Sequence, residues 1–256
     1  MSFFNRMLAS IGIGNAKVDT RLEKSEFIPG EDVNGVVHIQ GGAVEQEIGS
    51  IYIMIMTQYI RERDDRKYTH NYELARIRIS NQLKLSPNEN LEIPFTFTLP
   101  LDTPVTIGRV PVWLRTGLDV EMAVDPSDED SIRVHPHPDV AVVLEAASQL
   151  GCRLKSARCE HARYHQGDLP FMQEFEFHPG RYASRMAELE LVFYIRPDGL
   201  DILVEVDRRA RGLTGLFEQA FDMDEHKMML RLSRAHLNGG PAAIADLLAD
   251  TIERHI

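Results

Sequence analysis

The chain has 256 residues, of which 43% are hydrophobic and 26% are charged, which is typical of a folded globular protein and excludes a disordered, collagen-like or coiled-coil chain. Acidic residues outnumber basic ones by 39 to 28, so the formal net charge of −11 disfavours nucleic acid and anionic lipid as general partners. The only cysteines, Cys152 and Cys159, are too few for a disulfide framework and fit a reducing cytoplasm.

Residues 1–15 predict a short N-terminal helix. Its apolar residues recur at helical spacing and form one stripe, which consists of Phe3, Phe4, Met7, Leu8 and Ile11. A free apolar stripe must be covered, by the rest of the chain, by a second copy or by a membrane, and the scarcity of basic residues makes peripheral membrane contact the least favoured. We take these five residues as candidate partner-binding residues. The longest apolar stretch, Ile51–Met56, is far shorter than the roughly 20 residues of a membrane span.

Residues 16–136 predict the first of two tandem antiparallel β-sandwiches, because apolar and polar residues alternate in run after run. The run Ile51–Met56 is apolar on both sides and is expected to lie between two layers. The charged segment Arg61–Lys67 predicts the exposed tip of a hairpin. Pro94 lacks the amide proton that a central strand needs, so we expect an edge position or a bulge there.

Residues 137–256 predict the second β-sandwich, with a closing helix. The acid-, proline- and histidine-rich segment Asp125–Asp139 is taken as the domain boundary. Helical spacing over residues 140–150 predicts a short helix with Asp139 as N-cap and Gly151 as C-cap. Strands follow, including a hairpin at Pro197-Asp198-Gly199, and Pro241–Ile256 predicts a C-terminal helix.

Several segments closely resemble the bacterial sporulation-control family of stage zero, type M. The opening Met1-Ser2-Phe3-Phe4, with Leu8–Gly14 and Ala16–Thr20, matches the start of that family. The similarity continues through the segments Phe27–Gly30, Gly35–Ile39, Glu45–Ile48, Ile51-Tyr52, Ile93–Phe95, Leu99-Pro100 and Glu205–Leu213. The resemblance covers nearly the whole chain and is strongest in its first hundred residues.

The resemblance implies a two-domain, mainly β, arrestin-like protein that binds partners and has no established enzymatic activity. It brings no catalytic residue and no cofactor with it. Because a fold transfers more safely than a function, the partner has to be argued separately.

Charged and metal-ligating residues offer further candidate sites. The strand end around Glu205 and Asp207 carries three arginines that we take as candidate partner-binding residues: Arg208, Arg209 and Arg211. Oxygen ligands at Asp222, Asp224 and Glu225 lack the glycine and later glutamate of an EF-hand. Donors for zinc are present without a recognised spacing, at Cys152, Cys159, His135, His137, His161 and His165. We therefore predict no catalytic, cofactor or metal site.

The function expected from these patterns is that of a non-enzymatic cytoplasmic regulatory adaptor, whose partner is a signalling or cytoskeletal protein. The main alternative is a self-associating scaffold, for instance a homodimer formed through the terminal helices and sheet edges. A metal-dependent hydrolase using Asp222, Asp224 and Glu225 is the class most disfavoured.

Overall fold

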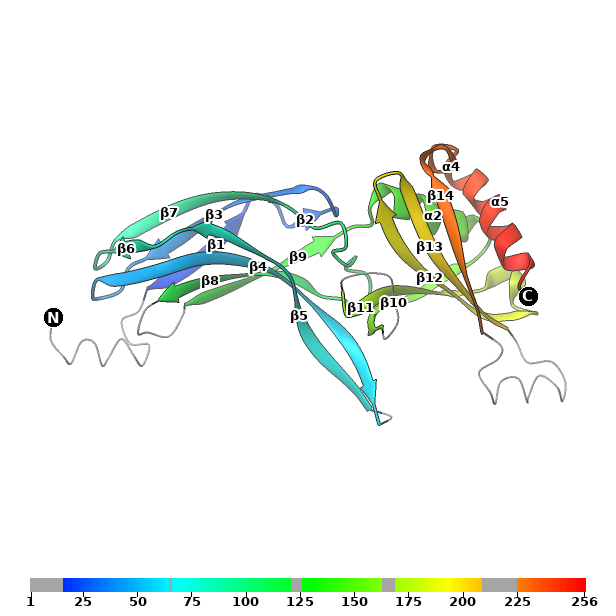
Figure 1. Cartoon of the computed structure of the whole chain (residues 1–256), viewed down its shortest axis with the longest axis horizontal. Coiled ribbons are helices and arrows are strands. Elements are labelled where there is room, and N and C mark those ends of the chain that lie inside the picture. Colours follow the sequence, from blue (N-terminus) through cyan, green and yellow to red (C-terminus); the bar gives the residue numbers. More distant parts are fainter. Residues whose placement is uncertain (1–15, 65, 121–125, 163–168, 209–224) are drawn as a thin grey trace. The chain divides into compact units, whose positions relative to one another are not determined.

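The computed structural model describes residues 16–64, 66–120, 126–162, 169–208 and 225–256 (Figure 1). Contacts divide the chain into two compact units. Unit 1 comprises Met1–Gln58, His70–Thr106 and Pro111–His135, and unit 2 comprises Tyr59–Thr69, Ile107–Val110 and Pro136–Ile256. The expected N-terminal helix over residues 1–15 lies outside the described residues. The fold is mainly β, as predicted from the alternation of apolar and polar residues.

One sheet of unit 1 has the strand order β1-β3-β7, and all its neighbours are antiparallel. Alternate residues of β3 point inward, among them Val33, Val37 and Ile39. Pro94 lies on β7, which ends this sheet, so the predicted edge position is confirmed. The strands are β1 (Lys17–Leu22), β3 (Asp32–Gln40) and β7 (Asn90–Thr98).

The second sheet of unit 1 is built around the long strand β4. Strands β8, β9 and β2 follow one another on one side of β4, and β5 and β6 pair with its other side. The turn of the β4–β5 hairpin lies between Arg63 and Arg66, which confirms the predicted charged tip. The strands are β2 (Glu26–Phe27), β4 (Gln46–Arg63), β5 (Arg66–Ser80), β6 (Leu83–Leu85), β8 (Val112–Val120) and β9 (Ser127–Val134).

The two sheets of unit 1 share one hydrophobic core. Val37 and Phe97 from the first sheet join Ile53 and Leu114 from the second in a single cluster of buried side chains. A hydrogen bond of 2.7 Å between the buried Thr20 and Thr116 hydroxyls also links the sheets. Unit 1 is therefore a β-sandwich, in which apolar burial supplies the main stabilisation.

Two details of unit 1 differ from the sequence-based expectation. Tyr52 and Met54 are only half-buried, whereas Met56 on the same side is 9% exposed, so the second side of β4 is only partly covered. The segment expected as a boundary, Asp125–Asp139, does contain the passage from unit 1 to unit 2, between His135 and Pro136. It also contains the strand β9, which was not expected there, because Ile132 and Val134 point into the core while acidic residues alternate with them.

Unit 2 contains one antiparallel sheet in the order β10-β11-β12-β13-β14. The hairpin between β12 and β13 turns at Pro197-Asp198, as predicted. A Cβ atom on Gly199 would lie 2.0 Å from the carbonyl oxygen of Leu232, so only glycine fits there. The strands are β10 (Arg153–His161), β11 (Phe171–His178), β12 (Met186–Arg196), β13 (Gly199–Arg208) and β14 (Glu225–Ser233).

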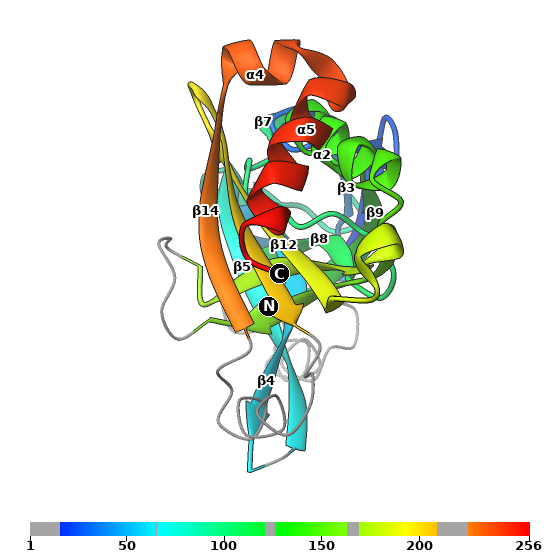
Figure 2. The same cartoon turned by 90° about the vertical axis from the view of Figure 1, so that its right-hand side faces the viewer.

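Helices, rather than a second sheet, accompany the sheet of unit 2 in the described ranges, which corrects the expected second sandwich (Figure 2). Helices α2 and α5 pack against each other, and their apolar stripes include the buried Val143 and Leu248; α2 also contacts β10 and β13. Such stripes bury the inner face of the sheet without more strands. The helices are α2 (Pro138–Gln149), α4 (Arg234–Asn238), α5 (Gly240–Glu253) and the 3₁₀ turn η1 (Gly180–Tyr182).

The caps of α2 also differ from the expectation. His137 is the N-cap, because its Nδ1 accepts a hydrogen bond of 3.3 Å from the amide of Asp139 and Pro138 occupies the first turn. Asp139 instead forms an ion pair with Arg234 at 2.7 Å. The helix ends at Gln149, and Gly151 follows with a positive φ of 80° that glycine adopts without strain. None of the described helices is long and apolar enough to span a membrane.

Candidate functional site

The polar face of the unit 2 sheet carries a dense set of glutamates. Every second residue of its strands is buried on the opposite face, as Phe175 and Phe177 of β11 are, so the residues between them share one outward face. We call this surface the carboxylate face and define it by six residues from β10, β11, β12 and β13: Glu160, Glu174, Glu176, Glu188, Glu190 and Glu205.

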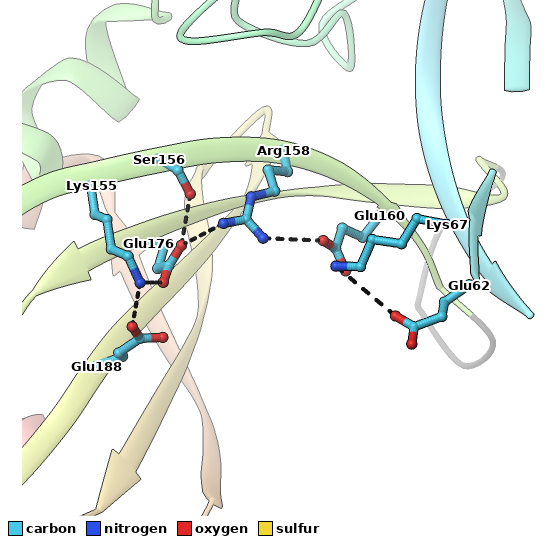
Figure 3. Close-up of polar contacts among 8 residues, drawn as sticks. All are labelled: Glu62, Lys67, Lys155, Ser156, Arg158, Glu160, Glu176 and Glu188. Carbon is cyan, nitrogen blue, oxygen red and sulfur yellow. Dashed lines mark hydrogen bonds and ion pairs between the residues drawn. The ribbon is translucent and has the colours of Figure 1, made fainter. Parts of the chain in front are cut away.

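Glu176 is the best-paired carboxylate of this face (Figure 3). A β-bulge between Leu154 and Ser156 places Lys155 next to it, and the Lys155 ammonium hydrogen-bonds both Glu176 and Glu188. The Ser156 hydroxyl donates to Glu176 Oε2 at 2.7 Å, and Arg158 Nη2 donates to the same oxygen at 3.1 Å. Burial raises the pKa of Glu176, but the hydrogen bonds from Lys155 and Ser156 outweigh it and lower that pKa to about 2.

Glu174 and Glu190 are in the opposite situation. Neither makes a hydrogen bond or ion pair with any residue that the structure describes. Arg158 stands opposite Glu174 in the β10–β11 register, yet its guanidinium binds Glu176 and lies 3.8 Å from Glu160. Burial, and then repulsion from Glu190 and Glu160, raises the pKa of Glu174 to about 7. Burial, and then repulsion from neighbouring glutamates, likewise raises the pKa of Glu190 to about 7.

These side chains line an open hollow of about 200 Å³. Its lining belongs entirely to unit 2 and consists of Lys67, Ser156, Arg158, Glu160, Glu174, Glu176, Glu188 and Glu190. The hollow is therefore a charged surface with an excess of carboxylates over cations.

Lys67 reaches the hollow from the tip of the β4–β5 hairpin. The Tyr59 ring stacks on Phe171 with 5.3 Å between ring centroids and on His161 with 6.2 Å. Ile60 forms a parallel bridge with Glu160. These contacts hold the hairpin against the unit 2 sheet at Tyr59 and Ile60.

The best-paired residues of the hollow do not form a nucleophile with a general base. The hydroxyl of Ser156 is bound to the carboxylate of Glu176, whose pKa of about 2 makes it a poor general base. Within the described ranges, no group of three or more His, Cys, Asp or Glu side chains is arranged to hold a metal ion. The hollow presents negative charge that attracts cations and protons.

The predicted partner-binding residues fall mostly outside the described ranges, which is where Phe3, Phe4, Met7, Leu8, Ile11, Arg209 and Arg211 lie. Arg208 is described as the last residue of β13, where its backbone pairs with Met186. The structure therefore leaves these residues as predictions.

The candidate metal ligands have other surroundings where they are described. His135 Nε2 lies 2.9 Å from Glu26, His137 caps α2, and His161 stacks on Tyr59. Cys152 and Cys159 are free, and burial raises their pKa values to about 11 and about 12, so both remain protonated thiols. Glu225 begins β14 opposite Asp207. Asp222, Asp224 and His165 lie outside the described residues.

The carboxylate face was missed at the level of sequence, although a signal was present. Acidic residues stand on both sides of an apolar residue in three segments: Glu174-Phe175-Glu176, Glu188-Leu189-Glu190 and Glu205-Val206-Asp207. Such a row of like charges on one face is unfavourable unless cations or protons neutralise it.

Comparisons with known proteins agree with the resemblance found in the sequence. Residues 4–210 match the family described as SpoOM protein. The sporulation-control protein spo0M of Bacillus subtilis (strain 168) is 46% identical over 239 residues, which cover 93% of each chain. The crystal structure of Spo0M from Bacillus subtilis superposes with a TM-score of 0.86 and 42% identity, and covers 95% of this chain and 100% of that one. The chain belongs to the Spo0M family of sporulation-control proteins.

Proposed function

We propose that this protein is a non-enzymatic regulatory adaptor that acts in the cytoplasm by binding other proteins, among which signalling and cytoskeletal proteins are the expected classes. Its membership of a sporulation-control family supports a regulatory role. The observation that carries the proposal is the open, charge-lined hollow on the sheet of unit 2. A rigid sheet that presents unpaired charge is suited to recognition without a chemical step.

An arrestin-like scaffold is part of this proposal. The two-sheet core of unit 1 supports it. Unit 2 departs from a plain sandwich, because helices α2 and α5 pack together beside its sheet. The buried thiols Cys152 and Cys159 fit the reducing cytoplasm in which such an adaptor would act.

The chemistry of the carboxylate face indicates the kind of partner. Glu174 and Glu190 have no cation bound to them in the part of the chain that the structure describes. A lysine- or arginine-bearing segment of a partner protein would supply the missing charge. The formal net charge of −11 also favours a basic protein surface over nucleic acid.

The test is crosslinking and affinity capture from native lysate, followed by reconstitution with the purified partner. We expect the Glu174→Gln/Glu190→Gln double variant to lose most of the binding. The matched control is Glu145→Gln/Glu253→Gln, which removes the same charge from exposed positions of α2 and α5 and is expected to bind like the wild type. Equal binding by all three proteins would contradict the assignment of the hollow, and the absence of any reconstituted partner would contradict the adaptor itself.

Self-association is the second candidate function, supported by the apolar stripe of Phe3, Phe4, Met7, Leu8 and Ile11. Light scattering at tens of micromolar protein tests it. Self-association would be supported if the wild type is a dimer and the Phe3→Ser/Phe4→Ser variant is a monomer. A monomeric wild type would contradict it. Arg208, Arg209 and Arg211 remain proposed partner contacts, to be tested as a triple Arg→Gln variant in the capture experiment.

A further inference from the structure

The strand β14 is the last strand of the unit 2 sheet. β13 pairs with one side of it along its whole length, from Glu225 opposite Asp207 to Ser233 opposite Gly199. Among the described residues, no strand pairs with its other side, and β14 lies at the outer edge of the sheet (Figure 2). We call this other side of β14 the free edge.

The backbone of β14 presents hydrogen-bonding groups to the free edge. The amide of Arg234 donates a hydrogen bond of 3.2 Å to the carbonyl of Asp198, just beyond the last pair of the β13–β14 ladder. That bond makes the last pair a non-hydrogen-bonded one, and bonded and non-bonded pairs alternate along an antiparallel ladder. Met229 and Arg231 therefore direct their N–H and C=O groups to the free edge, where no described residue binds them.

The core side of β14 is incompletely covered. Met228 and Leu230 stand opposite Val204 and Ile202 of β13. The two β13 residues are fully buried, whereas Met228 and Leu230 are only half-buried. β13 has a strand on each side and β14 has a strand on one side, so an added strand with apolar side chains would complete the core here.

The outward side of β14 carries two cations with an apolar residue between them. The side chain of Arg231 is 77% exposed, and its Nε lies 3.9 Å from Asp201, which already accepts a hydrogen bond of 2.9 Å from Arg196. Lys227 is also exposed, and Met229 between them is 42% exposed. A strand that lay along the free edge would meet cation, apolar and cation in turn.

β13 shows which sequence pairs well with this strand. Its segment Asp201-Ile202-Leu203-Val204-Glu205 stands opposite residues 227–231, with an acidic residue opposite each cation and three apolar residues between them. The free edge offers the same row of side chains to a strand on the other side. An occupant of this edge would therefore have the pattern of β13.

We propose that the free edge of β14 binds an extended segment of a partner protein, which adds antiparallel to the sheet and carries two acidic residues separated by three apolar ones. Backbone hydrogen bonds would hold such a strand, and its acidic residues would select it. Cations on an edge disfavour neutral and basic strands. A second copy paired about Met229 would set Lys227 against Arg231, which disfavours self-pairing in that register.

This inference adds a second surface to the proposed function, and it rests on that function only in taking a protein segment as the ligand. The hollow calls for a basic segment and the free edge for an acidic one, so the two surfaces would take different segments. Purified components can test the free edge without any lysate.

The first experiment is hydrogen exchange of the full chain, followed by nuclear magnetic resonance. In the free protein, the amides of Met229 and Arg231 should exchange faster than those of Met228 and Leu230, which bond to β13. The probe is a synthetic peptide with the sequence of residues 199–207. Saturation with it should slow the two edge amides at least about ten-fold. Edge amides that are already protected without the peptide would overturn the proposal.

N-methyl groups on the peptide test the backbone pairing. An N-methyl group at the position of Ile202 points away from β14 in the proposed arrangement and should leave binding intact. The same group at the position of Leu203, opposite Met229, removes an N–H that faces β14 and should abolish binding. Fluorescence anisotropy of the labelled peptides measures both. Equal binding of the two peptides, or the reverse order, would overturn the proposal.

Charge reversal tests the selection of acidic residues. Arg231→Glu should weaken binding of the peptide by about five-fold, and a peptide with lysine at the position of Asp201 should restore it. The control is Arg185→Glu, which reverses an exposed charge before β12 and should bind like the wild type. Equal binding by all three proteins would contradict the assignment of Arg231.

The outcomes separate this proposal from the adaptor. A peptide that does not bind would overturn the free-edge site and leave the adaptor, whose test uses the Glu174→Gln/Glu190→Gln variant, standing. A failed capture experiment would contradict the adaptor, whereas peptide binding would still support the free-edge site.

Discussion

Two neighbourhoods on one strand show how differently the same side chain behaves. Glu176 and Glu174 are two residues apart on β11 and share a face, yet the pKa of Glu176 is lowered to about 2 and that of Glu174 is raised to about 7. Burial acts against the charged form of both. The difference lies in the donors, since Lys155, Ser156 and Arg158 all reach Glu176. Placement of donors, rather than depth, decides the charge of a glutamate here.

The largest effect on stability is expected at Glu176, where three donor side chains meet. Glu176→Gln should lower the free energy of unfolding of unit 2 by about 3 kcal/mol, because Lys155, Ser156 and Arg158 lose a shared charged acceptor that is 7% exposed. Hydrogen exchange of peptides covering β11 and β12 measures this locally, and the fluorescence of the single tryptophan, Trp113 in unit 1, serves as the reference. Glu92→Gln, at an exposed position, is the control. An equal loss of unfolding free energy in Glu176→Gln and Glu92→Gln would show that the donors around Glu176 do not stabilise unit 2.

The pH dependence of stability is the next largest effect. The folded pKa values of Glu174 and Glu190, about 7, lie above the ordinary value of 4.5, so the fold favours their protonated forms. Their stabilisation is complete below about pH 4.5 and is lost as the pH rises through 7. After allowance for solvent screening, we expect unit 2 to lose about 2 kcal/mol between pH 5 and pH 8.

The same measurement distinguishes the two neighbourhoods by sign. The folded pKa of Glu176, about 2, lies below 4.5, so its contribution is present above pH 4.5 and is lost as the pH falls toward 2. Exchange rates, corrected for intrinsic chemistry, should therefore show greatest protection of β11 near pH 5. In the Glu174→Gln/Glu190→Gln variant, the loss of protection above pH 5 should vanish, and the loss of protection toward pH 2 should remain. A wild-type stability that rises from pH 5 to pH 8 would contradict this assignment.

Asp139 offers a further test of the role of donors, away from the sheet face. It is 8% exposed and its two oxygens lie 2.8 and 2.7 Å from Arg234 Nη1, which ties the start of α2 to the start of α4. Asp139→Asn should cost about 1–2 kcal/mol of the unfolding free energy, less than Glu176→Gln, because a single cation is left without its charge partner. Hydrogen exchange of α2 measures it. An unchanged α2 would show that this ion pair does not hold the helix.

The smallest effect is expected for Lys67→Gln. Its side chain is 55% exposed and its ion pair with Glu62 is long, so the stability of unit 2 at pH 7 should equal that of the wild type within experimental error. Thermal unfolding followed by circular dichroism checks this. A clear loss of stability would mean that Lys67 stabilises unit 2 despite its exposure.

Alternating hydrophobicity predicted the strands because it depends only on which face each residue buries. The charged tip of the β4–β5 hairpin, the turn at Pro197-Asp198 and the edge position of Pro94 follow from local residue chemistry, and the structure confirms all three. The helix over α5 was also predicted from its apolar stripe. These features need no knowledge of distant contacts.

Long-range relations were beyond such patterns. The alternation within β11 does not reveal which element covers its inner face, so a second sheet was expected where helices are found. Likewise, the pairing of Lys155 with Glu176 and Glu188 depends on strand order and on a bulge. Asp139 was expected as an N-cap because the spatial proximity of Arg234, 95 residues further along the chain, is not visible locally. The candidate site was missed for the same reason.

The bulge in β10 allows the charge of the carboxylate face to change while the strand pairing stays the same. Leu154 pairs with Phe177 and Ser156 pairs with Glu176. Lys155, which lies between them, therefore has no paired residue on β11. Deleting it would restore a regular ladder and leave every pairing from Ser156 onward in place. A gain or loss of one codon would therefore add or remove an ammonium group while the sheet keeps its register, and the electrostatics of the surface can be altered by chain length alone.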